Sequence, residues 1–192
     1  MIKPTLLLTF LLANAALAQQ HKAQPYAGLD ARPIASLSER DLQDLRAGRG
    51  WGLALPAELN GVPGPTHLLE HAQALGLSEA QREALEDIRS RMTQAAVAAG
   101  ADFIDAERAL SDAFADGAPD ADTLAALVQA AAQARGRLRL THLAANLETV
   151  PVLQEAQIAQ YNALRGYDVA GPCDAVPEGH AAAMWRRHNG CE

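Results

Sequence analysis

One stripe of apolar residues, recurring at steps of three and four, limits what this chain of 192 residues can fold into. The stripe runs through positions 85, 88, 92, 95, 99, 103, 106, 110 and 114. It follows Ser78 and Gln81, whose spacing is that of a capping box. In such a box the serine side chain accepts from the Gln81 amide, and the Gln81 side chain accepts from the Ser78 amide. The pattern predicts one long helix over about 78–115.

A second stripe predicts a second long helix, over 120–149. Between the two, Gly117 suits a helix C-terminus and Pro119 suits the first turn of the next helix. The inward face of the second helix is expected to carry Leu124, Leu127, Ala131, Ala134 and Leu138, continued after a small rotation by Leu140, Leu143, Leu147 and Val150. The expected fold class is therefore all-α: a long antiparallel helical hairpin with short flanking helices. Because such a hairpin leaves one apolar side uncovered, a homodimer is also expected.

Gly100 interrupts the first stripe. Glycine within a helix costs about 1 kcal/mol relative to alanine. Its presence therefore predicts a kink or a close helix contact at this position. Aromatic residues make up only 4% of the chain, so leucine and alanine must form the core. This composition predicts a thin helical layer rather than a thick globule.

The remaining segments divide the chain by their turn signals. Residues 19–37 are expected to form an extended lead-in, and 38–166 a helical domain. Within that domain, short helices are expected from Ser38 to Gly48, from Thr66 to Leu75, and from Leu153 to Gly166. Residues 60–65 combine Asn, Gly and Pro and predict a chain reversal. Residues 167–192 are expected to form a tail with a short helix near its end.

The first eighteen residues have the three parts of a secretory signal peptide. Lys3 supplies a positive start, an apolar run follows, and Ala16-Leu17-Ala18 has the small residues of a cleavage site. The run is shorter than the roughly 20 apolar residues of a membrane-spanning helix. We therefore expect cleavage after residue 18 and a periplasmic protein. A formal net charge of −7 argues against a nucleic-acid partner.

Two short motifs flank the expected hairpin. The first begins Leu77-Ser78 and ends at Gln81, and the second begins Leu153-Gln154 and ends at Gln157. Together they resemble the paired Leu-Thr-x-x-Gln motifs of the Spy/CpxP family, including its periplasmic heavy-metal sensor and resistance branch, with Ser78 and Gln154 in place of the usual Thr. The resemblance covers about residues 38–166. It implies a cradle-like homodimer that acts as an ATP-independent chaperone or as a metal-responsive envelope protein.

Histidines supply the candidate ligands in the helical domain. His67, Glu70 and His71 match the signature of inverted zinc peptidases, but those enzymes need a two-lobed chamber that this chain is too short to form. The alternatives are a non-catalytic metal site on His67 and His71, or a surface helix turn. His142 lies beside the apolar stripe of the second helix, with Asn146 one turn later. It is expected to be either a hydrogen-bonded structural residue or a metal ligand.

The tail carries the other candidates. His180, Met184 and His188 recur every four residues, so a helix would place an imidazole, a thioether and a second imidazole on one face, a donor set suited to Cu(I). Cys173 and Cys191 are the only cysteines, and in an oxidising compartment they are expected to form a disulfide.

Two functions remain open at this point, and neither is enzymatic. The first is a periplasmic metal-responsive binding or sensing protein that takes a transition metal ion, Cu or Zn, and has a possible membrane signalling partner. The alternative is a holdase chaperone for unfolded envelope proteins. A sensor needs at least three converging donors, whereas a holdase needs none of the histidines.

Overall fold

The computed structural model describes residues 24–167, 176 and 181–191. Within these ranges the chain is all-helical and has no strand, which confirms the all-α part of the predicted fold class. The α-helices are α1 (Glu39–Arg46), α2 (Leu55–Glu58), α3 (Pro65–Glu70), α4 (Glu79–Ala115), α5 (Ala121–Thr149), α6 (Glu155–Arg165) and α7 (Ala182–His188). Short 3-10 helices are η1 (Leu29–Ala31) and η2 (Val150–Val152). None of the described helices is long and apolar enough to cross a membrane.

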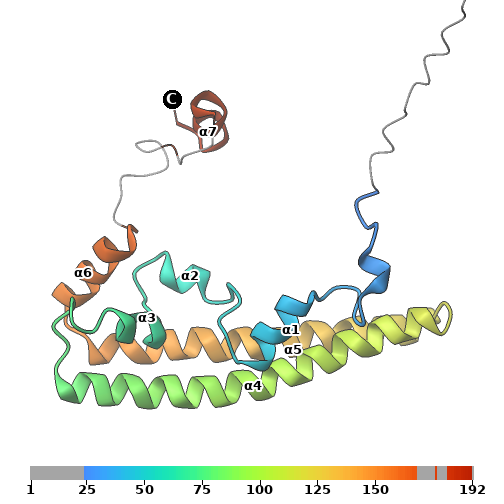
Figure 1. Ribbon diagram of the computed structural model, residues 1–192, viewed down its shortest axis with the longest axis horizontal. Coiled ribbons are helices and arrows are strands. Elements are labelled where there is room, and N and C mark those ends of the chain that lie inside the picture. Colours follow the sequence, from blue (N-terminus) through green and yellow to red (C-terminus); the bar gives the residue numbers. More distant parts are fainter. Residues whose placement is uncertain (1–23, 168–175, 177–180, 192) are drawn as a thin grey trace, which may run out of the picture.

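The two longest helices, α4 and α5, lie side by side and form the base of the molecule (Figure 1). The Ser78 side chain accepts from the Gln81 amide at 3.3 Å and the Gln81 side chain accepts from the Ser78 amide at 3.0 Å, so the predicted capping box is confirmed. At the start of α5, Asp120 Oδ1 accepts from the amides of Asp122 and Thr123, each at 2.9 Å. Both helices therefore begin where local side-chain chemistry can satisfy their first amides. Pro119 precedes the N-cap Asp120, so its predicted place in the first turn of α5 is wrong.

A second layer of short elements covers one side of this base. We call residues 34–77, which include α1, α2 and α3, the cover layer; Figure 1 shows these helices along α4 and α5. Two separate apolar clusters hold it down. The first joins it to the middle of α4 and α5 through Ile34, Leu37, Leu42, Leu45, Leu53, Ala96, Phe103, Ile104, Ala134 and Leu138. The second joins it to the start of α4 and to α6 through Leu68, Leu75, Leu77, Leu85 and Tyr161.

Gly100 lies at the tightest approach between the two layers. A Cβ atom at this position would lie 2.7 Å from the backbone oxygen of Leu45, at the end of α1. The predicted close helix contact is therefore confirmed, with α1 as the neighbour. The absence of a side chain at residue 100 lets α1 sit directly against the α4 backbone.

The predicted inward face of α5 is right in its first half and wrong in its second. Ala131, Ala134 and Leu138 are buried, but Leu140 and Leu147 are each 66% exposed, and Val150 is exposed as well. The buried positions of this half are His142, Ala145, Asn146 and Thr149. The reason is that this part of α5 faces polar backbone and side-chain groups of the cover layer, which need hydrogen-bonding partners.

Two other segments differ from the sequence-based expectation. The helix expected over 66–75 ends at Glu70, and the chain turns through 71–76 so that Leu75 and Leu77 reach the second cluster. The expected extended lead-in includes η1, and its last residues, Ile34 and Leu37, are fully buried in the first cluster.

Candidate functional site

The two sequence motifs meet through their glutamines. Gln81 Nε2 donates to Gln157 Oε1 at 2.8 Å, and Gln157 Nε2 donates back to Gln81 Oε1 at 3.2 Å. Each amide also bonds to backbone: Gln81 to the Val152 oxygen and Gln157 to the Leu75 oxygen. Gln157 Oε1 further accepts from the Gln154 amide at 3.0 Å. Leu77 is buried and Leu153 packs against the second cluster, so the motif residues lock the start of α6 onto the start of α4.

A buried carboxylate organises the middle of the cover layer. Glu58, at the end of α2, is 8% exposed. Its Oε1 accepts from the Gly64 amide at 2.8 Å and from Asn146 Nδ2 at 3.3 Å, and its Oε2 accepts from the Tyr161 hydroxyl at 2.6 Å. Burial and this bond to Glu58 raise the pKa of Tyr161, which keeps the phenol neutral and donating. One side chain thus connects α2, the 62–64 turn, α5 and α6.

The same turn is fixed from below by α5. Asn146 Nδ2 donates to the Val62 oxygen at 2.8 Å and the Thr149 hydroxyl donates to the Pro63 oxygen at 2.7 Å. A Cβ atom on Gly64 would lie 2.9 Å from Glu58 Oε1, so glycine leaves the space that this carboxylate fills. These bonds explain why α5 buries polar residues here, because unpaired buried backbone oxygens would be costly.

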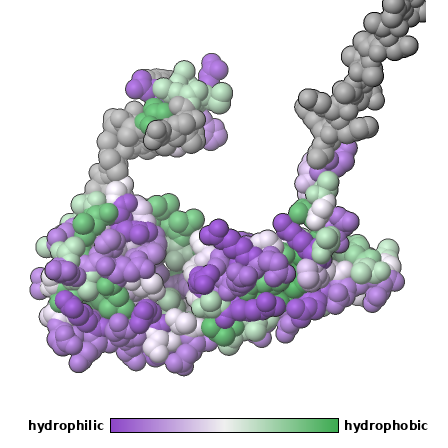
Figure 2. Space-filling model, in the orientation of Figure 1, coloured by the Kyte–Doolittle hydropathy of each residue, from purple (hydrophilic) through white to green (hydrophobic). Residues whose placement is uncertain are grey.

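Between the two apolar clusters the cover layer leaves an open cleft of about 790 Å³. Its walls come from the 47–55 segment, α2, the start of α3, α4, α5 and the end of α6, and Figure 2 shows the surface hollowed between the part built on α1 and the part built on α3 and α6. Apolar lining comes from Ala47, Trp51, Ala54, Leu55, Pro65 and Met92. Polar and charged lining comes from Arg49, Glu58, Thr66, His67, Arg89, Ser90, Thr93, Gln94, His142, Asn146, Arg165 and Tyr167. A volume of this size is typical of small-molecule sites.

His142 lines this cleft from α5 and is only 2% exposed. Its Nε2 atom is buried without a hydrogen-bond partner in the described structure. Burial lowers the pKa of the imidazole, so the ring is neutral at neutral pH. The prediction that His142 is either a hydrogen-bonded structural residue or a metal ligand therefore stays open.

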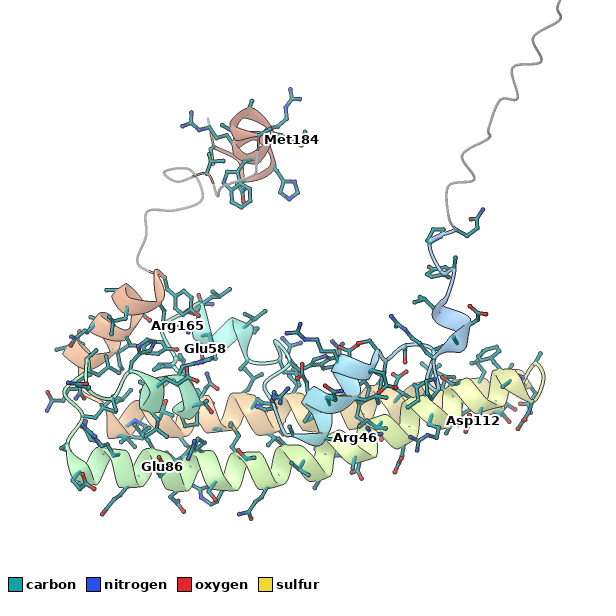
Figure 3. All side chains as sticks on the ribbon, in the orientation of Figure 1. Arg46, Glu58, Glu86, Asp112, Arg165 and Met184 are labelled. Carbon is teal, nitrogen blue, oxygen red and sulfur yellow. The ribbon has the colours of Figure 1, made fainter. Side chains whose placement is uncertain are left out.

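Three arginines give the cleft its charge. Arg49 is paired with Asp44, and Arg89 with Glu86. Arg165 donates to the Tyr167 hydroxyl from Nε at 3.2 Å and from a terminal nitrogen at 3.0 Å, and its guanidinium lies 5.5 Å from the centre of the Tyr167 ring. Figure 3 shows Arg165 and Glu58 close together. No ion pair within 4 Å joins Arg165 to a carboxylate in the described part of the chain.

The glycine-rich segment 48–52 forms one edge of the cleft, and the sequence-based predictions gave it no role. Trp51 has a φ of 46°, a conformation that bulky residues rarely adopt. It is held there by Nε1 donating to Asp41 Oδ1 at 2.8 Å and by contact with the Phe103 ring at 5.8 Å. Gly48, with a φ of 65°, lies so close to α4 that a Cβ would be 2.9 Å from the Thr93 oxygen. The cluster of glycines was the available signal.

The candidate metal ligands around α3, His67 and His71, contact different neighbours. His67 Nδ1 pairs with Glu70 Oε2 at 2.8 Å, whereas the His71 ring packs edge-on against Tyr161 at 6.3 Å. The described residues contain no group of three His, Cys, Asp or Glu that could hold a metal ion. In the tail, Met184 and His188 are exposed on α7, and His180 lies outside the described residues. Cys191 is disulfide-bonded, while Cys173, its expected partner, also lies outside them.

Comparison with protein-family models, with curated proteins and with solved structures finds no match for this chain. The relationship to the Spy/CpxP family therefore stays a prediction, which rests on the residues of the two motifs.

Proposed function

We propose that this chain is a non-catalytic binding protein of the bacterial envelope and that the cleft under the cover layer is its binding site. The observation that carries the proposal is the cleft itself, whose volume of about 790 Å³ suits a ligand of small-molecule size. Its lining mixes apolar side chains with a few polar groups, the composition typical of ligand sites.

The hydrogen bonds around Glu58 support this proposal because they fix the walls before any ligand arrives. Glu58, Asn146 and Thr149 tie the cover layer to α5 and α6 through short bonds between residues more than 80 positions apart in sequence. A preformed site loses less conformational entropy when it binds a ligand. We infer that the cleft binds its ligand without a large rearrangement of these elements.

The envelope location and the partners are further parts of the proposal. The features of residues 1–18 support export to the periplasm. The exposed apolar side chains of Leu140 and Leu147 on α5 would suit the interface of a cradle-like homodimer formed by the α4/α5 hairpin. The same surface would serve the alternative holdase function, in which unfolded envelope proteins bind to exposed apolar side chains.

A metal-responsive function is the second candidate, and α7 favours it. Met184 and His188 lie four residues apart on this helix, so they share one face, and both are exposed. Titration calorimetry of the mature protein with copper or zinc should then show binding that is lost when both residues are changed to alanine. Binding that survives this double change would contradict a metal site on α7.

The cleft itself can be tested with N-phenyl-1-naphthylamine, an uncharged naphthyl probe that fluoresces in apolar sites. Ser90 is an exposed α4 residue that lines the cleft, so Ser90→Phe should fill part of the cleft and weaken probe binding on the order of tenfold. Ala109→Phe adds the same ring to an exposed position of α4 outside the cleft and should leave binding unchanged. Equal binding by both variants, or no binding by the unaltered protein, would contradict the proposed site.

A further inference from the structure

We propose that the ligand of the cleft is a small organic anion, with an apolar body and a carboxylate or sulfonate group that Arg165 and Arg89 bind. This inference rests on the proposed function and specifies its ligand. It is carried by the charge of the cleft and by the free donor capacity of one arginine.

The cleft is lined by positively charged side chains, although the whole chain is acidic. The chain has a formal net charge of −7, but the described residues that line the cleft include Arg49, Arg89 and Arg165 and one acid, Glu58. Asp44 and Glu86, which pair with Arg49 and Arg89, are not among these lining residues. Both oxygens of Glu58 already accept bonds from the protein, from Gly64, Asn146 and Tyr161. The cleft therefore offers an anion more donors and less repulsion than the average acidic surface of this protein.

Arg165 has the greatest unused donor capacity of the three. A guanidinium has five N–H donors, and the bonds found for Arg165 go to one neutral acceptor, the Tyr167 hydroxyl. Arg49 and Arg89 each already have a carboxylate partner. A planar guanidinium binds a carboxylate or a sulfonate through two parallel hydrogen bonds, which makes Arg165 the best anchor for an anionic group.

The rest of the lining suits the body of such a ligand. Met92 and Pro65 provide apolar contacts, and the Met92 thioether can adapt to rings of different shape.

The test compares two probes that differ by one anionic group. 1-Anilinonaphthalene-8-sulfonate has the same ring system as N-phenyl-1-naphthylamine and carries a sulfonate in addition. We expect the unaltered protein to bind the sulfonate probe about tenfold more tightly, because hydrogen bonds between a guanidinium and an anionic group are stronger than those between neutral groups. Arg165→Gln should remove most of this preference, so that the two probes bind to the variant with similar affinities.

Two further variants serve as control and safeguard. Arg139→Gln makes the same change of charge at an exposed position of α5 outside the cleft and should bind both probes as the unaltered protein does. Should Arg165→Gln unfold the protein, as shown by its circular dichroism, Arg89→Gln decides instead. Arg89 has a side chain that is 45% exposed, and its loss should lower the affinity for the sulfonate probe several-fold.

The outcomes separate this inference from the proposed function. Equal affinities for the two probes, or equal effects of Arg165→Gln and Arg139→Gln, would overturn the anionic ligand while leaving an apolar binding cleft in place. Binding of neither probe, or binding of both that Ser90→Phe does not weaken, would overturn the cleft as the site. A sulfonate preference that is lost only in the cleft variants supports both.

Discussion

Replacing Gln157 by leucine is expected to lower the free energy of unfolding by about 3 kcal/mol. Gln157 is 8% exposed and makes bonds to Gln81, to the Leu75 oxygen and to the Gln154 amide. Leucine fits a similar volume but leaves these partners without their bonds, and each buried group left unpaired costs roughly 1–3 kcal/mol. Urea unfolding followed by circular dichroism measures the change.

Gln160→Leu is the matched control for this substitution. Gln160 lies on the same helix and also bonds to a backbone oxygen, that of Ala74 at 2.8 Å, but its bond is exposed, so water can replace it. We expect a loss below about 1 kcal/mol. If the two variants lost the same stability, the pairing of the two motif glutamines would not be what holds α6 to α4.

Replacing Gly100 by alanine is expected to destabilise the protein by about 2 kcal/mol. Helix propensity alone predicts the opposite effect, because alanine inside a helix is more favourable than glycine by about 1 kcal/mol. The added Cβ would lie 2.7 Å from the Leu45 backbone oxygen, and a backbone atom cannot move away without shifting α1. Overpacking of this kind costs roughly 1–3 kcal/mol. Thermal and urea unfolding both report it.

Gly136→Ala, at a glycine within α5, is expected to have the opposite effect and to stabilise the protein. No atom outside the local helix backbone lies within 4 Å of a Cβ built at this position. The substitution should therefore stabilise the protein by about 0.5–1 kcal/mol. If alanine raised the stability equally at both glycines, the close approach of α1 to α4 would be disproved.

The long helices could be predicted because their signals are local. The capping side chain of Ser78 lies within three residues of the amide it binds, and the apolar period of α4 needs only its own sequence. Gly100 could be identified as a close contact for the same reason, since glycine is costly in a helix. The partner that approaches it, Leu45, could not be named, because nothing near residue 100 encodes it.

The second half of α5 was predicted wrongly for a physical reason. Leucines at 140, 143 and 147 form a plausible inward stripe, but the neighbouring cover layer presents the Glu58 carboxylate and the oxygens of Val62 and Pro63. Asn146 and Thr149 donate hydrogen bonds to those acceptors, so the buried face of α5 carries these polar residues, and Leu140 and Leu147 are exposed. Apolar periodicity carries no information about polar groups that arrive from a segment more than 80 residues away.

The cleft could not be predicted from the sequence for a related reason. Its lining comes from several segments that are far apart in the chain, and His67 and His142 were considered from the sequence only as metal ligands or structural residues. Glu58 and Arg165 stand out only when the fold brings them to one space. The glycines around Trp51 were a local signal of the cleft edge, because both a close approach to α4 and an unusual backbone conformation favour glycine.

The most direct measurement of the central claim is a crystal structure of the mature protein grown with 1-anilinonaphthalene-8-sulfonate. We expect the naphthyl ring to lie against Met92 and Pro65 in the cleft, and the sulfonate to lie within hydrogen-bond distance of Arg165. A probe found instead on the exposed leucines of α5, with the cleft empty, would contradict it.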